Sequence, residues 1–262
     1  MPNLNLDEST REIQKSMSQI VHVEGSKVLP LGSALLLEYD QKFRLISAGH
    51  LINIEDYDKL LMPLSGTKEG LFIDTFGDLT TTNIQGDQEE NQVDYAEIVF
   101  NRADLETKVK MFYTPILEQN IDFNHKINEN DNRYFVFGYP ISRARFNYKK
   151  NGEMNSEPLR LTTYPIVQNE IYERNGFSKE THILLHIQRK ISREAERVFL
   201  PKTKGISGCG VYFLPNLKED KISSEYKLVG VLTEVDFEKQ FAVVVRMNTI
   251  KRNIEETTAN TR

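Results

Sequence analysis

The 262-residue sequence has a single cysteine, Cys209, so no disulfide can form within the chain. It lacks an apolar run long enough to cross a bilayer. Its first segment, Met1 to Ser18, is rich in acids and amides and has no apolar core of the kind found in a signal peptide. Together these absences predict a protein of the reducing cytoplasm that does not contact membranes.

The sequence also lacks the features of metal-binding and nucleic-acid-binding proteins. One cysteine and five scattered histidines provide no structural zinc spacing, and we expect neither a metal nor a cofactor. The formal net charge of -5 argues against a dedicated nucleic-acid binder. A hydrophobic content of 39% and a charged content of 27% are typical of a soluble globular protein, and the length allows a sizeable core.

Helical patterns are confined to the two ends of the chain, and the middle is typical of many short strands separated by turns. Residues 101–104 are predicted as a turn. Such a pattern favours barrels or a sandwich. We expect helices at about 7–17 and 248–256, and strands at about 20–23, 32–39, 43–47, 71–74, 95–100, 134–137, 159–163, 183–188, 210–213, 227–233 and 241–246.

The most informative stretch is the glycine-rich segment 204–210, in which three glycines flank Ser207. Glycines let the backbone turn through conformations closed to other residues, and they leave N–H groups bare to hold an anion. Ser207 is therefore a candidate nucleophile, with the N–H groups of Gly205 and Ser207 aimed at a developing oxyanion. The alternative is a tight turn between two strands.

Two upstream residues have the chemistry that a serine nucleophile needs. His50 follows an apolar strand, and a neutral imidazole is a base suited to neutral pH. Asp94 lies among strand-forming residues, and a carboxylate can fix the tautomer of such an imidazole. Each residue taken alone also fits a structural role. The order His50, Asp94, Ser207 is that of the chymotrypsin-type arrangement.

Several segments resemble the motifs of trypsin-like serine proteases, in the order found in that family. Residues 32–36 with 46–50 resemble the strand pair that leads to the catalytic histidine. Residues 93–98 resemble the aspartate motif, and residues 205–208 resemble the nucleophile loop. Residues 137–140 look like a Gly-x-Pro turn of bacterial members, and residues 229–232 look like the strand that pairs with the substrate backbone. The chain is therefore similar to the bacterial cytoplasmic type of this family over residues 18–250.

The resemblance implies an all-β fold of two six-stranded antiparallel β-barrels with short terminal helices and the active site between the barrels. We place a helical segment at 1–16, the first barrel at 17–118, a linker at 119–131, the second barrel at 132–247, and a helix with a tail at 248–262.

The function implied is that of a serine endopeptidase acting on a protein or peptide through an acyl-enzyme, without a metal or cofactor. Ser207 attacks the carbonyl, His50 serves as general base and then general acid, and Asp94 orients His50. The N–H groups of Gly205 and Ser207 hold the oxyanion.

The resemblance also assigns substrate-binding residues. The floor of the primary pocket falls at Pro201, which has no carboxylate to pair with a substrate lysine or arginine. Glu234 and Asp236 could place an acid on the pocket wall, but we favour a solvated turn for them. The residues expected to pair with substrate backbone are Val229, Gly230, Val231, Leu232 and Thr233.

Two residues of the nucleophile loop depart from the family pattern. Ile206 precedes the serine, where secreted animal members have an acid that pairs with a newly freed N-terminus. We therefore expect Ile206 to pack among apolar residues. Cys209 stands where glycine is usual, and we interpret it as a packed, inert cysteine rather than a competing nucleophile.

Two other functions remain open. A protease-like fold could bind a peptide or partner protein without turnover, and an esterase would share the triad chemistry. Some bacterial members that resemble this chain accompany antiviral defence proteins and cleave a dedicated partner, which is a further expectation here. The sequence indicates nothing about the oligomeric state.

Overall fold

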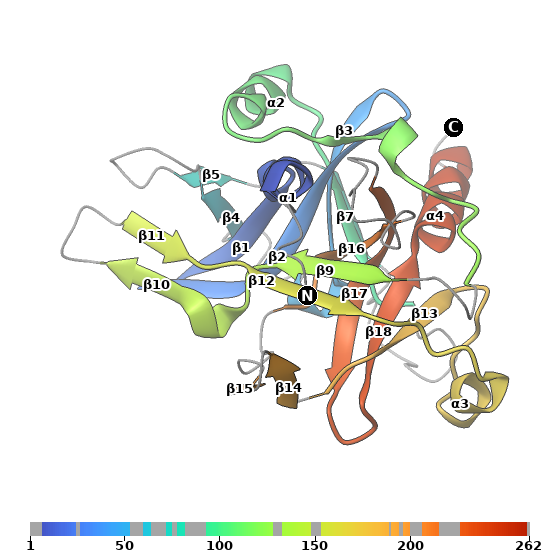
Figure 1. The fold of residues 1–262 in the computed structure, drawn as a ribbon. Helices are drawn as coiled ribbons and strands as arrows, with labels where there is room; N and C mark the ends of the chain where they lie inside the picture. The colour runs from blue at the N-terminus through green and yellow to red at the C-terminus, as the bar shows by residue number, and fades with distance from the viewer. Residues whose placement is uncertain are drawn as a thin grey trace.

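The computed structural model consists mainly of β-strands arranged in two large antiparallel sheets (Figure 1). It describes residues 7–24, 27–52, 60–63, 72–74, 78–81, 93–127, 133–147, 153–188, 190–193, 196–199, 206–214 and 226–260.

The first sheet is built from the N-terminal half of the chain, in the order β5-β4-β1-β2-β3-β7-β6, and β8 joins β2 in parallel. In β2, Ala34 and Leu36 face a core inside this half, whereas Leu35 and Leu37 face a core shared with the second sheet. Both faces are covered, which explains why the apolar run of this strand does not alternate with polar residues. The strands are β1 Met17–Glu24, β2 Lys27–Tyr39, β3 Lys42–Ser47, β4 Leu60–Pro63, β5 Phe72–Asp74, β6 Asp78–Thr81, β7 Ala96–Val99 and β8 Ile116–Leu117.

The second sheet has six strands in the order β12-β9-β16-β17-β18-β13 and curls into a half-barrel. Beyond the end of β12, Pro165 forms a bridge with Leu185 of β13, and the N–H of Ile166 donates to Leu184 O at 2.7 Å. Its strands are β9 Tyr134–Gly138, β12 Leu159–Thr163, β13 His182–His186, β16 Cys209–Phe213, β17 Lys227–Asp236 and β18 Phe241–Arg246. Two separate hairpins are β10 Ala144–Asn147 with β11 Glu153–Ser156, and β14 Lys190–Arg193 with β15 Glu196–Phe199.

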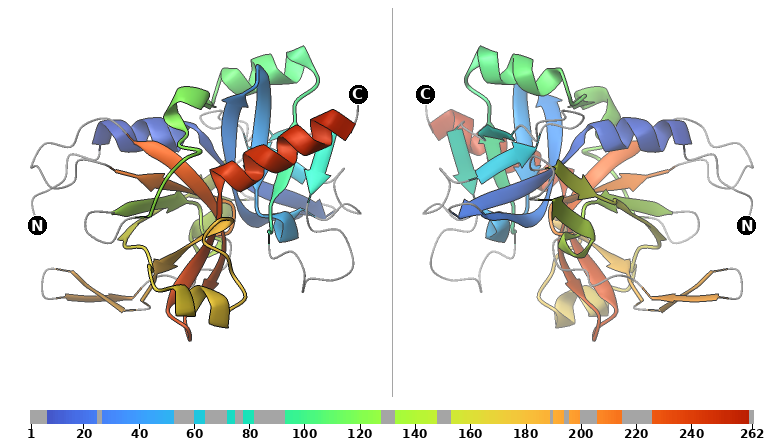
Figure 2. Two further views of the ribbon diagram at one scale, coloured as in Figure 1. Left: turned by 90° about the vertical axis from the view of Figure 1, so that its right-hand side faces the viewer. Right: turned by 90° about the vertical axis from the view of Figure 1, so that its left-hand side faces the viewer.

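One apolar cluster joins the two halves. It contains Leu35 from β2, Phe137 from β9 and Tyr212 from β16. Two helices complete it: Ile13 comes from α1 (Asp7–Lys15) and Ile250 from α4 (Met247–Asn260). Figure 2 shows that α4 follows the second sheet in the chain but lies across the strands of the first. The two sheets therefore share one hydrophobic core.

The prediction of a mainly β protein is confirmed, but the expectation that helices are confined to the ends is wrong. The predicted turn at 101–104 leads into a helix, α2 Ala103–Lys110, and α3 Asn169–Arg174 lies between β12 and β13. α2 buries only Leu105 and Val109, one turn apart, and this pair is too short a pattern to mark a helix in the sequence. In the described part of the chain, no pairing joins the edge strands β5 and β6 of the first sheet.

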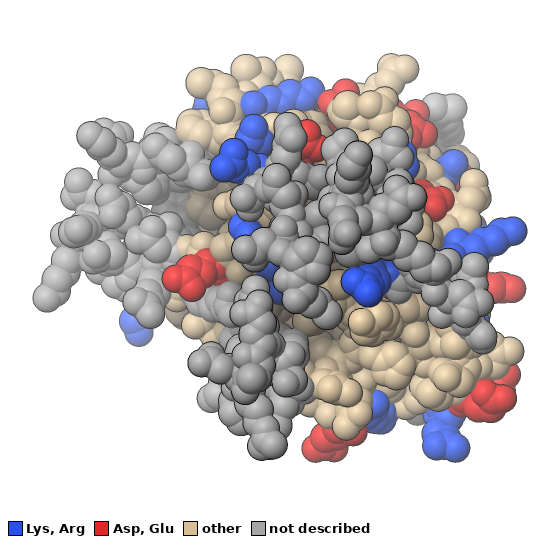
Figure 3. Space-filling model, in the orientation of Figure 1, with Lys and Arg blue, Asp and Glu red and all other residues tan. Residues whose placement is uncertain are grey.

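Charges of both signs are interspersed among the described residues on the face drawn in Figure 3. None of the helices that the structure describes combines the length and the apolar character needed to cross a membrane.

Residues 119–127, the described part of the predicted linker, pack against the second sheet. After the short 3-10 helix Glu118–Asn120, Ile121 forms a parallel bridge with Leu228. His125 is buried, and its Nε2 lies 2.6 Å from the hydroxyl oxygen of Tyr134. Composition marked this segment as polar, but tertiary contacts hold it in place.

We predict that His125 makes the protein less stable as pH falls below about 6.5. Burial lowers the pKa of His125, Arg246 lowers it further, and Asp122 opposes the shift. The unfolded chain then binds a proton at His125 that the folded chain does not bind. The free energy of unfolding therefore falls by at most about 1.4 kcal/mol per pH unit. The free energy of unfolding, measured from pH 7.5 to 5.5, should fall more steeply for the wild type than for His125→Gln. Equal slopes would contradict this assignment.

Candidate functional site

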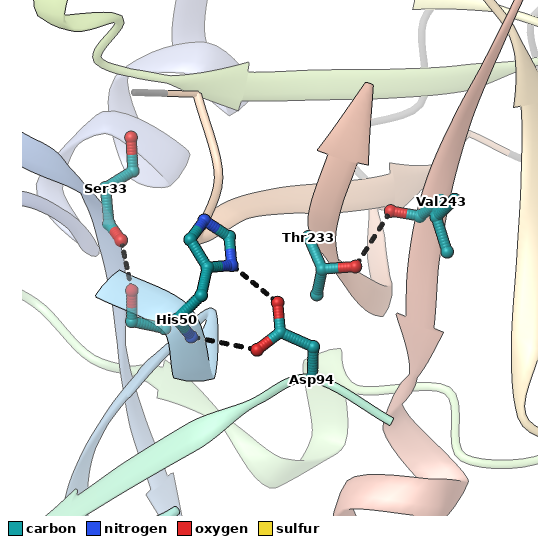
Figure 4. Close-up of polar contacts among 6 residues, drawn as sticks. Ser33, His50, Asp94, Thr233 and Val243 are labelled. Atoms are coloured by element: carbon teal, nitrogen blue, oxygen red, sulfur yellow. Dashed lines mark hydrogen bonds and ion pairs between the residues drawn. The ribbon is translucent and has the colours of Figure 1, made fainter. Parts of the chain in front are cut away.

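His50 and Asp94 are brought together by neighbouring strands of the first sheet. β3 ends at Ser47, which pairs with Ala96 at the start of β7, so the segments that leave these strands lie side by side. His50 lies in the 3-10 helix Gly49–Leu51. Its Nδ1 is 2.6 Å from Asp94 Oδ2, and its main-chain N–H donates to Asp94 Oδ1 at 2.9 Å (Figure 4).

Both oxygens of the Asp94 carboxylate are therefore used on one histidine. This arrangement favours the imidazole tautomer with its proton on Nδ1, which leaves Nε2 free to accept a proton. The His50 side chain is 45% exposed and that of Asp94 is 30% exposed. The Asp94 carboxylate thus holds His50 at its main-chain N–H and at Nδ1, and the imidazole is open to solvent or to a substrate.

Ser207 lies at a tight turn that carries the chain into β16. The N–H of Cys209 donates to Ile206 O at 3.1 Å, and the N–H of Gly208 donates to Leu232 O at 2.7 Å. Gly208 has a φ of +82°, and a Cβ built there would lie 1.8 Å from Ser33 O. Only glycine fits this position, both for its backbone conformation and for the close approach of β2.

The turn is anchored on β2. The N–H of Ser33 donates to Ser207 O at 3.0 Å. A Cβ on the neighbouring Gly32 would lie 3.0 Å from that same oxygen and 2.4 Å from Cδ1 of Leu51, the residue after His50. The main chain of Ser207 and the histidine segment therefore both pack on Gly32.

The contacts of the described residues include no hydrogen bond between the side chains of Ser207 and His50, so this contact stays a prediction. The Ser207 N–H has no acceptor among the described residues, as an oxyanion donor requires. Gly205 and Pro201, predicted for the oxyanion hole and the pocket floor, lie outside the described residues.

The strand pairings argue against substrate pairing at Gly230, Val231 and Leu232, part of the predicted stretch 229–233, because both of their edges are already occupied. For Val229 and Thr233 the substrate contact stays a prediction. Gly230, Val231 and Leu232 pair with β16 on one side, and β18 covers the other side. Pairing with β16 ends at Leu232, next to a bulge at Thr233, whereas pairing with β18 continues through Glu234, Val235 and Asp236. In the described part of the chain, the second edge of residues 234–236 has no strand partner.

At the end of β17, Thr233, Glu234 and Asp236 have separate roles. Thr233 is buried, and its Oγ1 donates to Val243 O at 3.4 Å (Figure 4). Glu234 is exposed. Asp236 is the last residue of β17, and its Oδ1 accepts the N–H groups of Glu238 and Lys239 in the following turn, each at 2.9 Å. The turn predicted at Glu234 and Asp236 therefore begins one residue after Asp236.

The two unusual loop residues are both buried. Ile206 is 1% exposed and lies in the apolar core of the second sheet, which confirms that it packs among apolar residues. Cys209 is fully buried, and this burial raises the pKa of its thiol to about 12. A thiol at that pKa holds almost no thiolate at neutral pH, in agreement with an inert cysteine.

The family models and the curated proteins contain no match to this chain. Among the described residues, no three histidine, cysteine or acidic side chains come together to form a metal site. One residue that holds the Ser207 turn, Ser33, was not predicted from the sequence, although it lies in the segment 32–36 that resembles a family motif. Nothing in the spacing of β2 marks it, because its partners come from segments far along the chain.

Proposed function

We propose that the protein is a serine endopeptidase whose triad is His50, Asp94 and Ser207. The observation that carries this proposal is the double contact of Asp94 with His50, where β3 ends and β7 begins. A histidine held in this way can act as a general base, and it needs a nearby group that gives up a proton. The anchoring of the Ser207 turn on Gly32 and Ser33 supports the serine as that donor.

In the proposed reaction, His50 Nε2 takes the proton of Ser207 Oγ as this oxygen attacks the carbonyl carbon of a peptide bond. Asp94 stabilises the imidazolium that forms. The Ser207 N–H, and the Gly205 N–H by resemblance, hold the negative oxygen of the tetrahedral intermediate. His50 then gives its proton to the leaving amine. A water molecule, activated by the same histidine, releases the acyl group.

In the part of the chain that the structure describes, residues 234–236 have no strand partner on one edge, and this edge supports a peptide as the substrate. An extended peptide adds to a free strand edge through main-chain hydrogen bonds, whereas a small ester does not need such an edge. The finer architecture belongs to the same proposal: each sheet closes into a barrel, and the active site lies between the two.

A serine-reactive fluorophosphonate probe tests the proposal directly. Covalent labelling at Ser207, located by mass spectrometry, is the expected result. An intact protein that binds peptides but takes no label would favour the binding module instead.

We also predict that no N-terminal cut is needed for activity. Burial and a hydrogen bond to Glu12 of α1 raise the pKa of Tyr226 to about 12, and Gln14 bonds Tyr139. The N-terminal helix thus contacts two separate segments, and Ile206 offers no carboxylate to a freed amine.

Trimming provides the test of this prediction. The intact chain should react with the probe, and chains that begin between Ser18 and Val21 should unfold at a lower temperature, because they lose the buried side chain of Ile13. Labelling of trimmed chains alone, with the full-length mass unmodified, would refute the prediction.

A further inference from the structure

Ser33 lies at the point where the two halves meet, and it is fully buried in β2. Buried polar groups are normally hydrogen-bonded, and those of Ser33 contact four residues from three segments. Its partners are Ser207, Ser47, Tyr139 and Cys209.

The main-chain groups of Ser33 join the nucleophile turn to the histidine segment. Its N–H donates to Ser207 O at 3.0 Å. Its carbonyl oxygen accepts the hydroxyl of Ser47 at 2.7 Å (Figure 4). Ser47 is the last residue of β3, and the chain continues from there to His50. These two bonds do not depend on the Ser33 side chain.

The side chain of Ser33 adds a second set of bonds toward the other half. Its Oγ accepts the N–H of Tyr139 at 2.8 Å, and the Cys209 thiol donates to the same oxygen at 3.4 Å. The surroundings leave no slack, since a Cβ on Gly138 would lie 1.8 Å from Cys209 Sγ and 2.9 Å from Ser33 Oγ. Cys209 Sγ therefore lies in the space that a side chain at Gly138 would fill.

We propose that the Ser33 hydroxyl is a positioning group for the Ser207 turn. It holds Cys209, two residues after Ser207, against the end of β9, while the Ser33 N–H holds the carbonyl of Ser207. The turn is thereby fixed at both ends relative to β2, which pairs with β3, the strand that leads to His50. This inference rests on the proposed function for its catalytic consequence, but the positioning itself is a statement about the turn.

The test compares Ser33→Ala with the wild type in saturation kinetics with the fluorophosphonate probe. The variant keeps the main-chain bonds and loses the acceptor for Tyr139 and Cys209. We expect a limiting labelling rate roughly ten- to a hundredfold lower, because small misplacements of a nucleophile are costly, with an unchanged half-saturating probe concentration.

Two further variants separate positioning from stability. Thr249→Val is the control, because it removes another buried hydroxyl, that of Thr249 in α4, which donates to Thr181 O at 3.4 Å. It should lower the unfolding temperature without changing the limiting labelling rate. Cys209→Ala removes only the thiol donor and should give a smaller loss than Ser33→Ala. If Ser33→Ala does not fold, the limiting rate of Cys209→Ala decides: a lower rate supports the proposal, and a wild-type rate overturns it.

Hydrogen exchange provides a readout that does not depend on catalysis. In Ser33→Ala, the amides of Tyr139 and of residues 206–210 should exchange faster, and in Thr249→Val they should not. If the wild type labels and Ser33→Ala labels at the same limiting rate, the positioning proposal is overturned while the protease proposal stands. If the wild type takes no label, the protease proposal fails, and exchange alone decides: faster exchange supports positioning by Ser33, and unchanged exchange overturns it.

Discussion

Ser207→Ala should abolish labelling by a fluorophosphonate probe and lower peptide hydrolysis on the order of 10⁴- to 10⁶-fold. The hydroxyl is the only part of the proposed nucleophile that this change removes. The contacts that hold the turn come from the main chain, so the unfolding temperature should stay at the wild-type value. The measurements are probe labelling, hydrolysis of a peptide library and thermal unfolding of the same preparations.

Matched variants of His50 and Asp94 separate the roles within the site. His50→Ala removes the base and should be as damaging as Ser207→Ala. Asp94→Asn keeps the shape of the side chain but offers an amide where the imidazole needs an acceptor, so a loss on the order of 10⁴-fold is expected. Full labelling of Ser207→Ala would show that another residue is the nucleophile, and wild-type activity of His50→Ala would remove the triad from the proposal.

The local elements of the fold could be predicted because their signals are local. β2 and β3 are apolar runs separated by a turn, and Asp40 and Gln41 in that turn have φ values of 51° and 56°. Asp tolerates the left-handed region, and polar residues between two apolar runs predict a turn. Short strands such as β8, with two residues, have no periodicity to detect.

The pairing of His50 with Asp94 could be predicted from chemistry, because a serine nucleophile needs these two residue types. The edge at residues 234–236, which has no strand partner among the described residues, could not be predicted, because its position depends on where β16 stops pairing with β17. That end is set by the bulge at Thr233 and by the bond from Gly208 to Leu232. Contacts of this kind join residues from distant segments, and no spacing in the sequence encodes them.

The sequence also does not predict the most deeply buried ion pair that the structure describes, Arg44 with Glu97, because these residues are distant in the chain. Their side chains are 2% and 3% exposed, and the guanidinium donates to the carboxylate. Arg44 lies on β3 and Glu97 on β7, the strands next to His50 and Asp94. The Arg44 Nε–H also donates to Tyr39 O at 3.2 Å. This pair fastens together the two strands that position the candidate base and its carboxylate.

We predict that Glu97→Gln lowers the free energy of unfolding by about 3–5 kcal/mol, because it leaves the Arg44 charge buried without a counter-charge. The double variant Glu97→Leu with Arg44→Met removes both charges and should recover most of this loss. The measurement is urea-induced unfolding at neutral pH. Glu97→Gln within about 1 kcal/mol of the wild type would show that water or a polar neighbour already satisfies Arg44.

The exposed pair of Glu106 and Lys110 is the matched control. These side chains lie one helical turn apart on α2, with a Nζ to Oε1 distance of 2.5 Å, and are 35% and 40% exposed. Water replaces the lost partner at such a site, so Glu106→Gln should cost less than about 1 kcal/mol. If Glu106→Gln and Glu97→Gln cost the same, burial does not set the strength of the Arg44 pair. A large difference would show that burial sets the strength of the Arg44 pair, which joins the two strands that lead to His50 and Asp94.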